Sequence, residues 1–376
     1  MPERLKAALR FALIQVSGVV CILMLAELLL RVLFGMPLGL FAFTLTSPQG
    51  MYPPNARIPM VWGKIAYVVE TNSFGLRGRE ISRDKPRGTV RIAAIGDSAT
   101  DGFYVDNPDT YPWILQDLLQ ERGHAAEVIN AARGGASIDK EFAILREVVL
   151  PLDPDLALIA FVTNDINGIV GKSRPTLLYS TLKREVLGPW DRLRVRTAVG
   201  ETVTDLAIRI RDPGYRRSRG QLRSRLAAGG ERRYRIRGGR NFEANAKLFD
   251  RLFSSVDGAV SREPFDPQIE KLIDNYLWAL AKLKEFCRDH GIELVFIYFP
   301  SYPQVYDEES STRINGILGD ACEQLSIPFL DLTEVFRREG RDSVLHLAPL
   351  DFHPNPAGNR VFARAVADFL EARDLL

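Results

Sequence analysis

The chain has 376 residues with 49 lysines and arginines against 47 aspartates and glutamates, so its formal net charge is only +2. Such a balance gives no global attraction to nucleic acid. No Cys-x-x-Cys pair or clustered histidines accompany its three cysteines, which argues against a disulfide framework and a metal site, and no G-x-G-x-x-G segment indicates a dinucleotide cofactor. We therefore expect neither metal nor cofactor.

The N-terminal segment is long and apolar enough to span a membrane. Residues 11–26 carry no charge, and the apolar character continues to residue 34 around Glu27 and Arg31. About 24 residues of helix suffice to cross a bilayer. Glu27 and Arg31 are four residues apart, so they can pair on one helix face near the interface. A cleavable signal peptide is the alternative, but the small-residue pattern of a cleavage site is poor here.

Charge sets the expected orientation of this helix. Three basic residues precede the apolar run: Arg4, Lys6 and Arg10. Positive flanks tend to stay in the cytoplasm. We expect a cytoplasmic tail at residues 1–10, one transmembrane helix at 11–34, a linker and lead-in at 35–70, and the rest of the chain outside the cytoplasm. The apolar stretch at 38–45 is too short to span a membrane and should either lie at the interface or pack on the domain.

Residues 71–376 alternate short β-branched runs with helical patterns. This rhythm predicts a parallel sheet covered by helices on both faces. The expected strands are 90–95, 127–130, 156–162, 293–299 and 329–332. The expected helices are 111–121, 137–149, 268–289, 311–324 and 355–372. Ligands of such sheets bind at the carboxyl ends of the strands.

A basic insertion interrupts this alternation at about residues 172–264. Between Lys183 and Arg240 there are 17 basic and 6 acidic residues. Two interpretations stay open: a solvated excursion, or a lid or surface for anionic glycans or lipid headgroups. Aromatic residues are sparse in it, which disfavours nucleic acid.

The cysteines have no predicted catalytic role. Cys21 lies in the N-terminal apolar run. Cys287 and Cys322 fall on expected helices, where we expect buried free thiols. A disulfide between them is the alternative, because a compartment outside the cytoplasm permits one.

Gly96-Asp97-Ser98 places a hydroxyl directly after the expected strand 90–95. These are also common turn residues, so the tripeptide alone is a weak signal. A serine hydroxyl is a weak nucleophile that needs a neighbouring base. The chain has four histidines from which such a base could come: His124, His290, His346 and His353.

His353 is the best candidate for that base. His124 and His290 fall in surface turns, and His346 has no obvious partner in the sequence. Asp351 stands two residues before His353, after the last expected strand. It would orient the imidazole and stabilise its protonated form.

Acyl transfer also needs donors aimed at the developing oxyanion. The backbone N–H groups of Ser98 and Gly135 and the side-chain amide of Asn164 can supply three. Considered alone, Gly135 would be an ordinary turn glycine, and Asn164 would be an ordinary helix N-cap. Because each of the three residues follows an expected strand, they should meet at one edge of the sheet.

In order and spacing these residues resemble the four blocks of the SGNH (GDSL-type) hydrolases. The blocks are Gly96-Asp97-Ser98, Asn130-x-x-x-x-Gly135, Asn164-Asp165 and Asp351-x-His353. Residues 72–77, Asn-Ser-Phe-Gly-Leu-Arg, look like the lead-in of membrane-attached bacterial members. The resemblance covers about 70–376 without the insertion.

The resemblance implies a flavodoxin-like three-layer α/β/α fold with a parallel five-stranded sheet. It implies Ser98 as nucleophile, His353 as general base and Asp351 as its orienting acid. It also implies an oxyanion hole made by Ser98, Gly135 and Asn164. Together with the N-terminal helix, it places this SGNH-like domain on the periplasmic side of a bacterial inner membrane.

The expected function is that of a serine esterase or deacetylase acting through an acyl-enzyme on a carboxylic ester, most simply an acetyl ester, of a glycan or lipid. Two departures from the family pattern concern the acyl acceptor. Val162 stands where many members have glycine, and Asp-x-His replaces Asp-x-x-His. The shorter spacing is similar to that of members acting on cell-surface polysaccharides, including O-acetyltransferases.

Two alternatives follow. A polysaccharide O-acyltransferase would use the same triad and need a partner that delivers an acyl donor across the membrane. A non-catalytic envelope protein would bind glycan through the arginine-rich insertion.

Overall fold

The computed structural model describes residues 3–34, 51–62, 65–179, 264–265, 267–306, 310–347 and 351–376. The apolar stretch expected at the interface, 38–45, lies outside these residues. So does the arginine-rich insertion, apart from 172–179 and 264.

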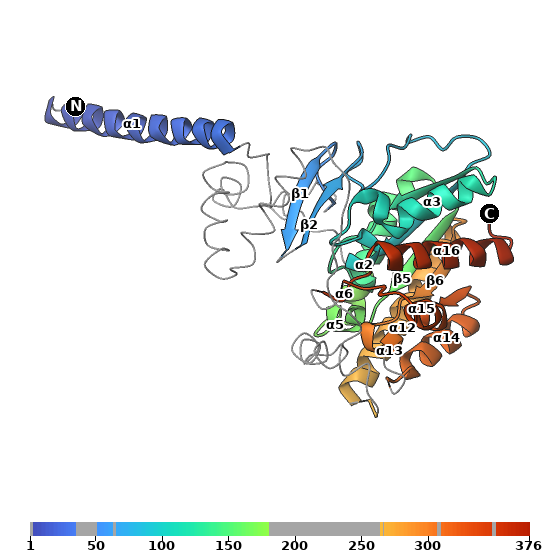
Figure 1. Cartoon of the computed structure of the whole chain (residues 1–376). Coiled ribbons are helices and arrows are strands. Elements are labelled where there is room, and N and C mark those ends of the chain that lie inside the picture. Colours follow the sequence, from blue (N-terminus) through green and yellow to red (C-terminus); the bar gives the residue numbers. More distant parts are fainter. Residues whose placement is uncertain are drawn as a thin grey trace.

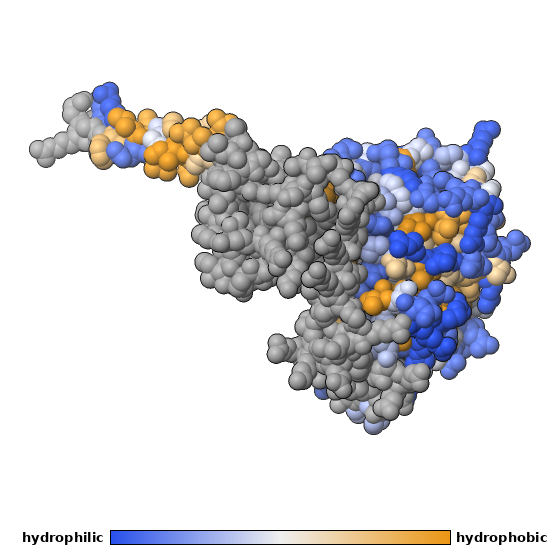
Figure 2. All heavy atoms as spheres, viewed as in Figure 1, coloured by the Kyte–Doolittle hydropathy of each residue, from blue (hydrophilic) through white to orange (hydrophobic). Residues whose placement is uncertain are grey.

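One long helix, α1 (Glu3–Phe34), stands apart from the sheet in Figure 1. Within it, Arg10–Leu29 is long and apolar enough to cross a membrane, and its apolar side chains are exposed along its length in Figure 2. A signal sequence near an N-terminus has the same length and composition.

The centre of the fold is a five-stranded sheet in which every strand pair is parallel. Its order is β4-β3-β5-β6-β7, the flavodoxin-like order of the predicted fold. The strands are β3 (Val90–Gly96), β4 (Ala126–Asn130), β5 (Leu156–Phe161), β6 (Glu293–Tyr298) and β7 (Phe329–Asp331). All six residues of β5 are buried, as expected of a central strand covered on both faces.

Helices cover both faces of this sheet (Figure 1). Successive residues of β3 point alternately into two hydrophobic cores, one on each face. Ala93 and Ile95 pack in the core with α4 (Ile138–Ile144), α12 (Pro267–Asp289) and α14 (Arg313–Gln324). Ile92 and Ala94 pack in the opposite core, which includes α3 (Tyr111–Glu121), α15 (Thr333–Gly340) and α16 (Pro356–Ala372). The side-chain period of two along a strand thus produces three layers.

The strands and helices expected within 71–376 are present, with ends that differ by at most two residues except at 137–149, and the N-terminal helix begins at Glu3 instead of residue 11. At 137–149, α4 ends at Ile144, and a π-helical turn (Leu145–Val149) and a 3₁₀ turn (Leu150–Leu152) follow. Pro151 has no N–H to continue an α-helix.

Several short elements were not predicted. The helical ones are α2 (Ser98–Asp101), a 3₁₀ turn (Asn107–Asp109), α5 (Asn164–Gly168), α6 (Arg174–Tyr179), α13 (Tyr302–Tyr306) and α15. A hairpin of β1 (Arg57–Trp62) and β2 (Ile65–Glu70) occupies part of the expected linker. Pro59 in β1 is a signal against a strand, but an edge strand of a two-stranded sheet tolerates it.

The cysteines are free, as predicted. Cys287 and Cys322 are buried, and Cys21 is exposed on α1. Burial raises the pKa of the Cys287 and Cys322 thiols to about 12, so neither is a reactive thiolate near neutral pH.

Candidate active site

The candidate site lies at the carboxyl ends of the adjacent strands β3 and β5. The chain passes from β3 to β4 on one side of this pair, and from β5 to β6 on the other. This topological switch point is where open α/β sheets bind ligands. Ser98 begins α2 immediately after β3, and Asn164 begins α5 after β5. Asp97 caps α2, because its side chain accepts a hydrogen bond from the backbone N–H of Ala99 at 2.9 Å.

The structure brings Ser98, His353 and Asp351 into one hydrogen-bonded line. The Nε2 atom of His353 lies 2.8 Å from the Oγ atom of Ser98. The Nδ1 atom of His353 hydrogen-bonds to the carboxylate of Asp351, which also accepts the backbone N–H of His353 at 3.0 Å. A carboxylate only accepts, so Nδ1 carries the proton and Nε2 is left to accept from the serine hydroxyl.

Opposing forces act on the pKa of His353. Burial of the ring lowers it, but the charge and hydrogen bond of Asp351, together with the charges of Asp97 and Asp101, outweigh burial and leave the pKa above its ordinary value of 6.5. Burial raises the pKa of Asp351, yet its interactions with His353 lower it overall. The pair is therefore arranged to stabilise an imidazolium beside a carboxylate.

Two aromatic side chains that no sequence pattern indicates flank His353. Phe103 stacks on the imidazole with ring centres 5.9 Å apart, and Tyr104 meets it edge-on at 5.0 Å. Both follow the serine turn closely in sequence, but no spacing signal connects them to a histidine near the C-terminus. They fix the plane of the ring from two sides.

Asn164 is held beside the serine by Asp97. Its Nδ2 atom donates to Oδ2 of Asp97 at 2.9 Å, and the Oγ atom of Ser98 lies 3.2 Å from the same oxygen. An amide has two N–H bonds, and the second one has no acceptor among the described residues. This second N–H is therefore available to a bound ligand, and the oxyanion role of Asn164 stays a prediction.

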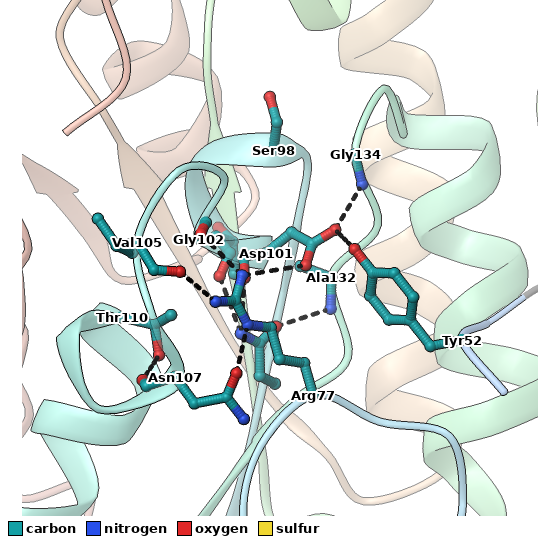
Figure 3. Close-up of polar contacts among 12 residues, drawn as sticks. Tyr52, Arg77, Ser98, Asp101, Gly102, Val105, Asn107, Thr110, Ala132 and Gly134 are labelled. Carbon is teal, nitrogen blue, oxygen red and sulfur yellow. Dashed lines mark hydrogen bonds and ion pairs between the residues drawn. The ribbon is translucent and has the colours of Figure 1, made fainter. Parts of the chain in front are cut away.

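Gly135, the third predicted oxyanion donor, does not line this cavity as Ser98 and Asn164 do. It follows β4 with φ of +69°, a left-handed conformation that glycine adopts without strain. It is absent from the described residues that line the cavity beside Ser98. Its neighbour Gly134 donates its backbone N–H to Asp101 at 3.0 Å (Figure 3). The oxyanion role of Gly135 stays a prediction.

A cavity of about 260 Å³ opens beside the serine. Ser98, Asn164, Asp351 and His353 all contribute to its wall, and most of the remaining wall is apolar. The other lining residues are Asp97, Ala99, Val162, Thr163, Phe299, Pro300, Ser301, Tyr302, Phe352 and Pro354. Among the residues that the structure describes, no group of three His, Cys, Asp or Glu side chains could hold a metal ion.

The other three histidines are engaged elsewhere. His124 pairs with Glu371 at 3.0 Å, and His290 bonds the carbonyl of Phe286 at 2.8 Å. His346 is fully buried beside Tyr306, and burial lowers its pKa to about 3, so it stays neutral. None of them contacts Ser98.

Comparison with known proteins gives the family. The model of the GDSL-like lipase/acylhydrolase family matches residues 94–361. No curated protein matches the chain in sequence.

Several solved structures resemble it distantly. The acetyl xylan esterase AlAXEase is 12% identical (TM-score 0.42, covering 74% of this chain and 98% of that one). TesA is 14% identical (TM-score 0.40, 75% and 98%). Axe2, an acetylxylan esterase from Geobacillus stearothermophilus, is also 14% identical (TM-score 0.40, 75% and 94%). Because the family model spans well over half of the chain, this protein belongs to the GDSL-like lipase/acylhydrolase family of ester hydrolases, as its motifs predicted.

Proposed function

We propose that this protein is a serine esterase in which Ser98, His353 and Asp351 form the catalytic triad. The observation that supports this most strongly is the hydrogen-bonded line from the Ser98 hydroxyl through His353 to Asp351, which opens into a cavity. Nucleophile, base and orienting acid are in the order that acyl transfer needs.

The proposed reaction has two steps. The Oγ atom of Ser98 attacks the ester carbonyl while Nε2 of His353 takes its proton, and the tetrahedral oxyanion accepts hydrogen bonds from the Ser98 N–H and the Asn164 amide. The imidazolium then gives its proton to the leaving alcohol, which leaves an acyl-serine. Water, deprotonated by the neutral imidazole, attacks this acyl group and releases the acid, returning the proton to Ser98.

The proposed substrate is an acetyl ester on a glycan or lipid outside the cytoplasm. An acetyl group is small compared with the cavity of about 260 Å³, which leaves room for some of the alcohol. The apolar N-terminal helix would keep the enzyme at a membrane. The Asp-x-His spacing, similar to that of family members acting on cell-surface polysaccharides, also supports a glycan.

The activity is expected to fall as the pH drops. The base must be neutral to accept the serine proton, and Asp351 holds the pKa of His353 above 6.5. The acid limb of the kcat/KM profile should therefore have its midpoint above pH 6.5. A profile that stays flat down to pH 5 would contradict His353 as the base.

Replacing Asn164 with alanine is expected to reduce kcat by about 10²- to 10³-fold, the usual effect of removing one oxyanion donor. KM should change little, because the donor acts on charge that develops in the transition state. Steady-state kinetics with p-nitrophenyl acetate measure both parameters. Asn275→Ala is the matched control: this half-buried asparagine on α12 accepts a hydrogen bond from Arg174 and does not line the cavity, so both parameters should stay unchanged. A loss under threefold at position 164 would contradict the role.

The proposed function is tested by p-nitrophenyl acetate hydrolysis with the full-length chain in detergent. Sustained turnover is the expected result. A single burst of nitrophenol that becomes turnover only when an acceptor sugar is added would instead indicate the acyltransferase. A folded protein that shows neither turnover nor a burst of nitrophenol would indicate a glycan-binding protein.

A further inference from the structure

A buried arginine ahead of the matched family region holds the loop that follows the nucleophile. Arg77 is only 2% exposed, and its guanidinium donates to four acceptors in residues 101–107 (Figure 3). These are the carbonyls of Asp101 and Gly102, each at 2.7 Å, the carbonyl of Val105, and the side-chain oxygen of Asn107 at 2.8 Å. One planar fork therefore fixes most of this loop.

Two tyrosines that, like Arg77, lie between α1 and β3 also support this loop. Tyr52 donates its hydroxyl to Asp101 at 2.8 Å, and that carboxylate oxygen also accepts the backbone N–H of Gly134 (Figure 3). The phenol oxygen of Tyr67 accepts a hydrogen bond from the backbone N–H of Tyr104. Residues before the matched family region thus contact the loop from several directions.

The supported loop carries Tyr104 in an unusual conformation. Its φ is +70°, which costs free energy in a residue with a side chain and persists only where the surroundings fix it. The buried hydroxyl of Tyr104 hydrogen-bonds to Asp351, and its ring meets the imidazole of His353 edge-on at 5.0 Å. Tyr104 therefore contacts both partners of the nucleophile.

We propose that Tyr104 is a positioning residue that holds Asp351 and His353 in line with Ser98, and that Arg77 keeps Tyr104 in place. This inference rests on the proposed serine esterase. Tyr104 contacts Asp351 and His353 but is not itself among the described residues that line the cavity, so it acts through the triad and not on the substrate. The lead-in segment between the apolar helix and the sheet is then part of the working site.

The pH profile separates this role from a purely structural one. The charged groups that influence His353 are Asp351, Asp97 and Asp101, while His346 beside it is neutral. Removing the Tyr104 hydroxyl takes a hydrogen bond from the Asp351 carboxylate, which then stabilises the imidazolium more strongly. The pKa of His353 should rise, and the acid limb of activity should move to higher pH.

The test is Tyr104→Phe in the full-length chain with p-nitrophenyl acetate. We expect kcat to fall about tenfold, the equivalent of one hydrogen bond to a charged group, KM to stay within about twofold, and the acid limb to move to higher pH. Tyr276→Phe is the matched control, because this buried hydroxyl on α12 has no hydrogen-bond partner among the described residues. Unchanged kinetics in Tyr104→Phe, or the same change in the control, would overturn the proposal.

Arg77→Lys tests the second part of the proposal, that Arg77 keeps Tyr104 in place. It keeps the charge but loses the fork, so kcat should fall while KM stays within about twofold. In a double-mutant cycle with Tyr104→Phe the two losses should be less than multiplicative, since both act through one loop. Fully independent losses would overturn the link to Arg77. A wild-type chain without turnover would instead count against the proposed function itself.

Discussion

Replacing Ser98 with alanine is expected to abolish ester hydrolysis, with kcat reduced by roughly 10⁴-fold or more, as for other triad nucleophiles. No other described hydroxyl hydrogen-bonds to the imidazole of His353, so no second nucleophile can take over. The fold should survive, because the cap of α2 depends on the Asp97 side chain and the backbone of Ala99. Steady-state kinetics and thermal unfolding of the same sample measure both effects.

His353→Ala should give a loss of similar size, because nucleophile and base act as one unit and their losses are not additive. The double variant should therefore be no slower than either single one. Retained turnover in either folded single variant would contradict the triad. His124→Ala is the matched control: this histidine pairs with Glu371 at the surface, so activity should stay at the wild-type level.

Asp351→Asn is expected to lower kcat by about 10⁴-fold, the cost of losing the orienting carboxylate in a triad. An amide can donate to Nδ1, which favours the wrong tautomer and leaves Nε2 protonated. It also removes the charge that raises the pKa of His353, so the acid limb of the remaining activity should move to lower pH. This shift is opposite to the one expected for Tyr104→Phe.

Asp117→Asn provides the comparison for this substitution. Asp117 lies on α3, where its partly exposed carboxylate pairs with Arg79. The same chemical change there should leave kcat and the pH profile as in the wild type. A fall of less than tenfold for Asp351→Asn would show that the carboxylate next to His353 does not orient it.

The fold could be predicted because its signals are local. The strand patterns of β3 and β5 are short and apolar, and buried parallel strands are apolar on both faces. The sequence does not predict the β1–β2 hairpin. Pro59 disfavours a strand, and its pairing with Val68 depends on a turn and a partner that no local pattern indicates.

The line from Ser98 to Asp351 could be predicted for a related reason. Ser98 and Asn164 follow parallel strands directly, and all such ends share one edge of the sheet. The motif of His353 and Asp351 was recognised from its order and spacing. The sequence therefore specified which residues meet, although they are far apart along the chain.

The supporting contacts could not be predicted. Arg77 reads as an ordinary arginine in a polar lead-in, and its four acceptors are mostly carbonyls, which every residue has. Tyr104 adopts a positive φ that its sequence neighbours do not require. Such contacts arise only when the lead-in packs against the finished sheet.

The most direct test of the central claim is labelling of the full-length protein in detergent with a fluorophosphonate probe, followed by peptide mass spectrometry. We predict stoichiometric labelling at Ser98 in the wild type and none in Ser98→Ala, because only a hydroxyl activated by His353 attacks the phosphorus. Labelling at another residue, or no labelling of folded wild-type protein, would contradict Ser98 as the nucleophile.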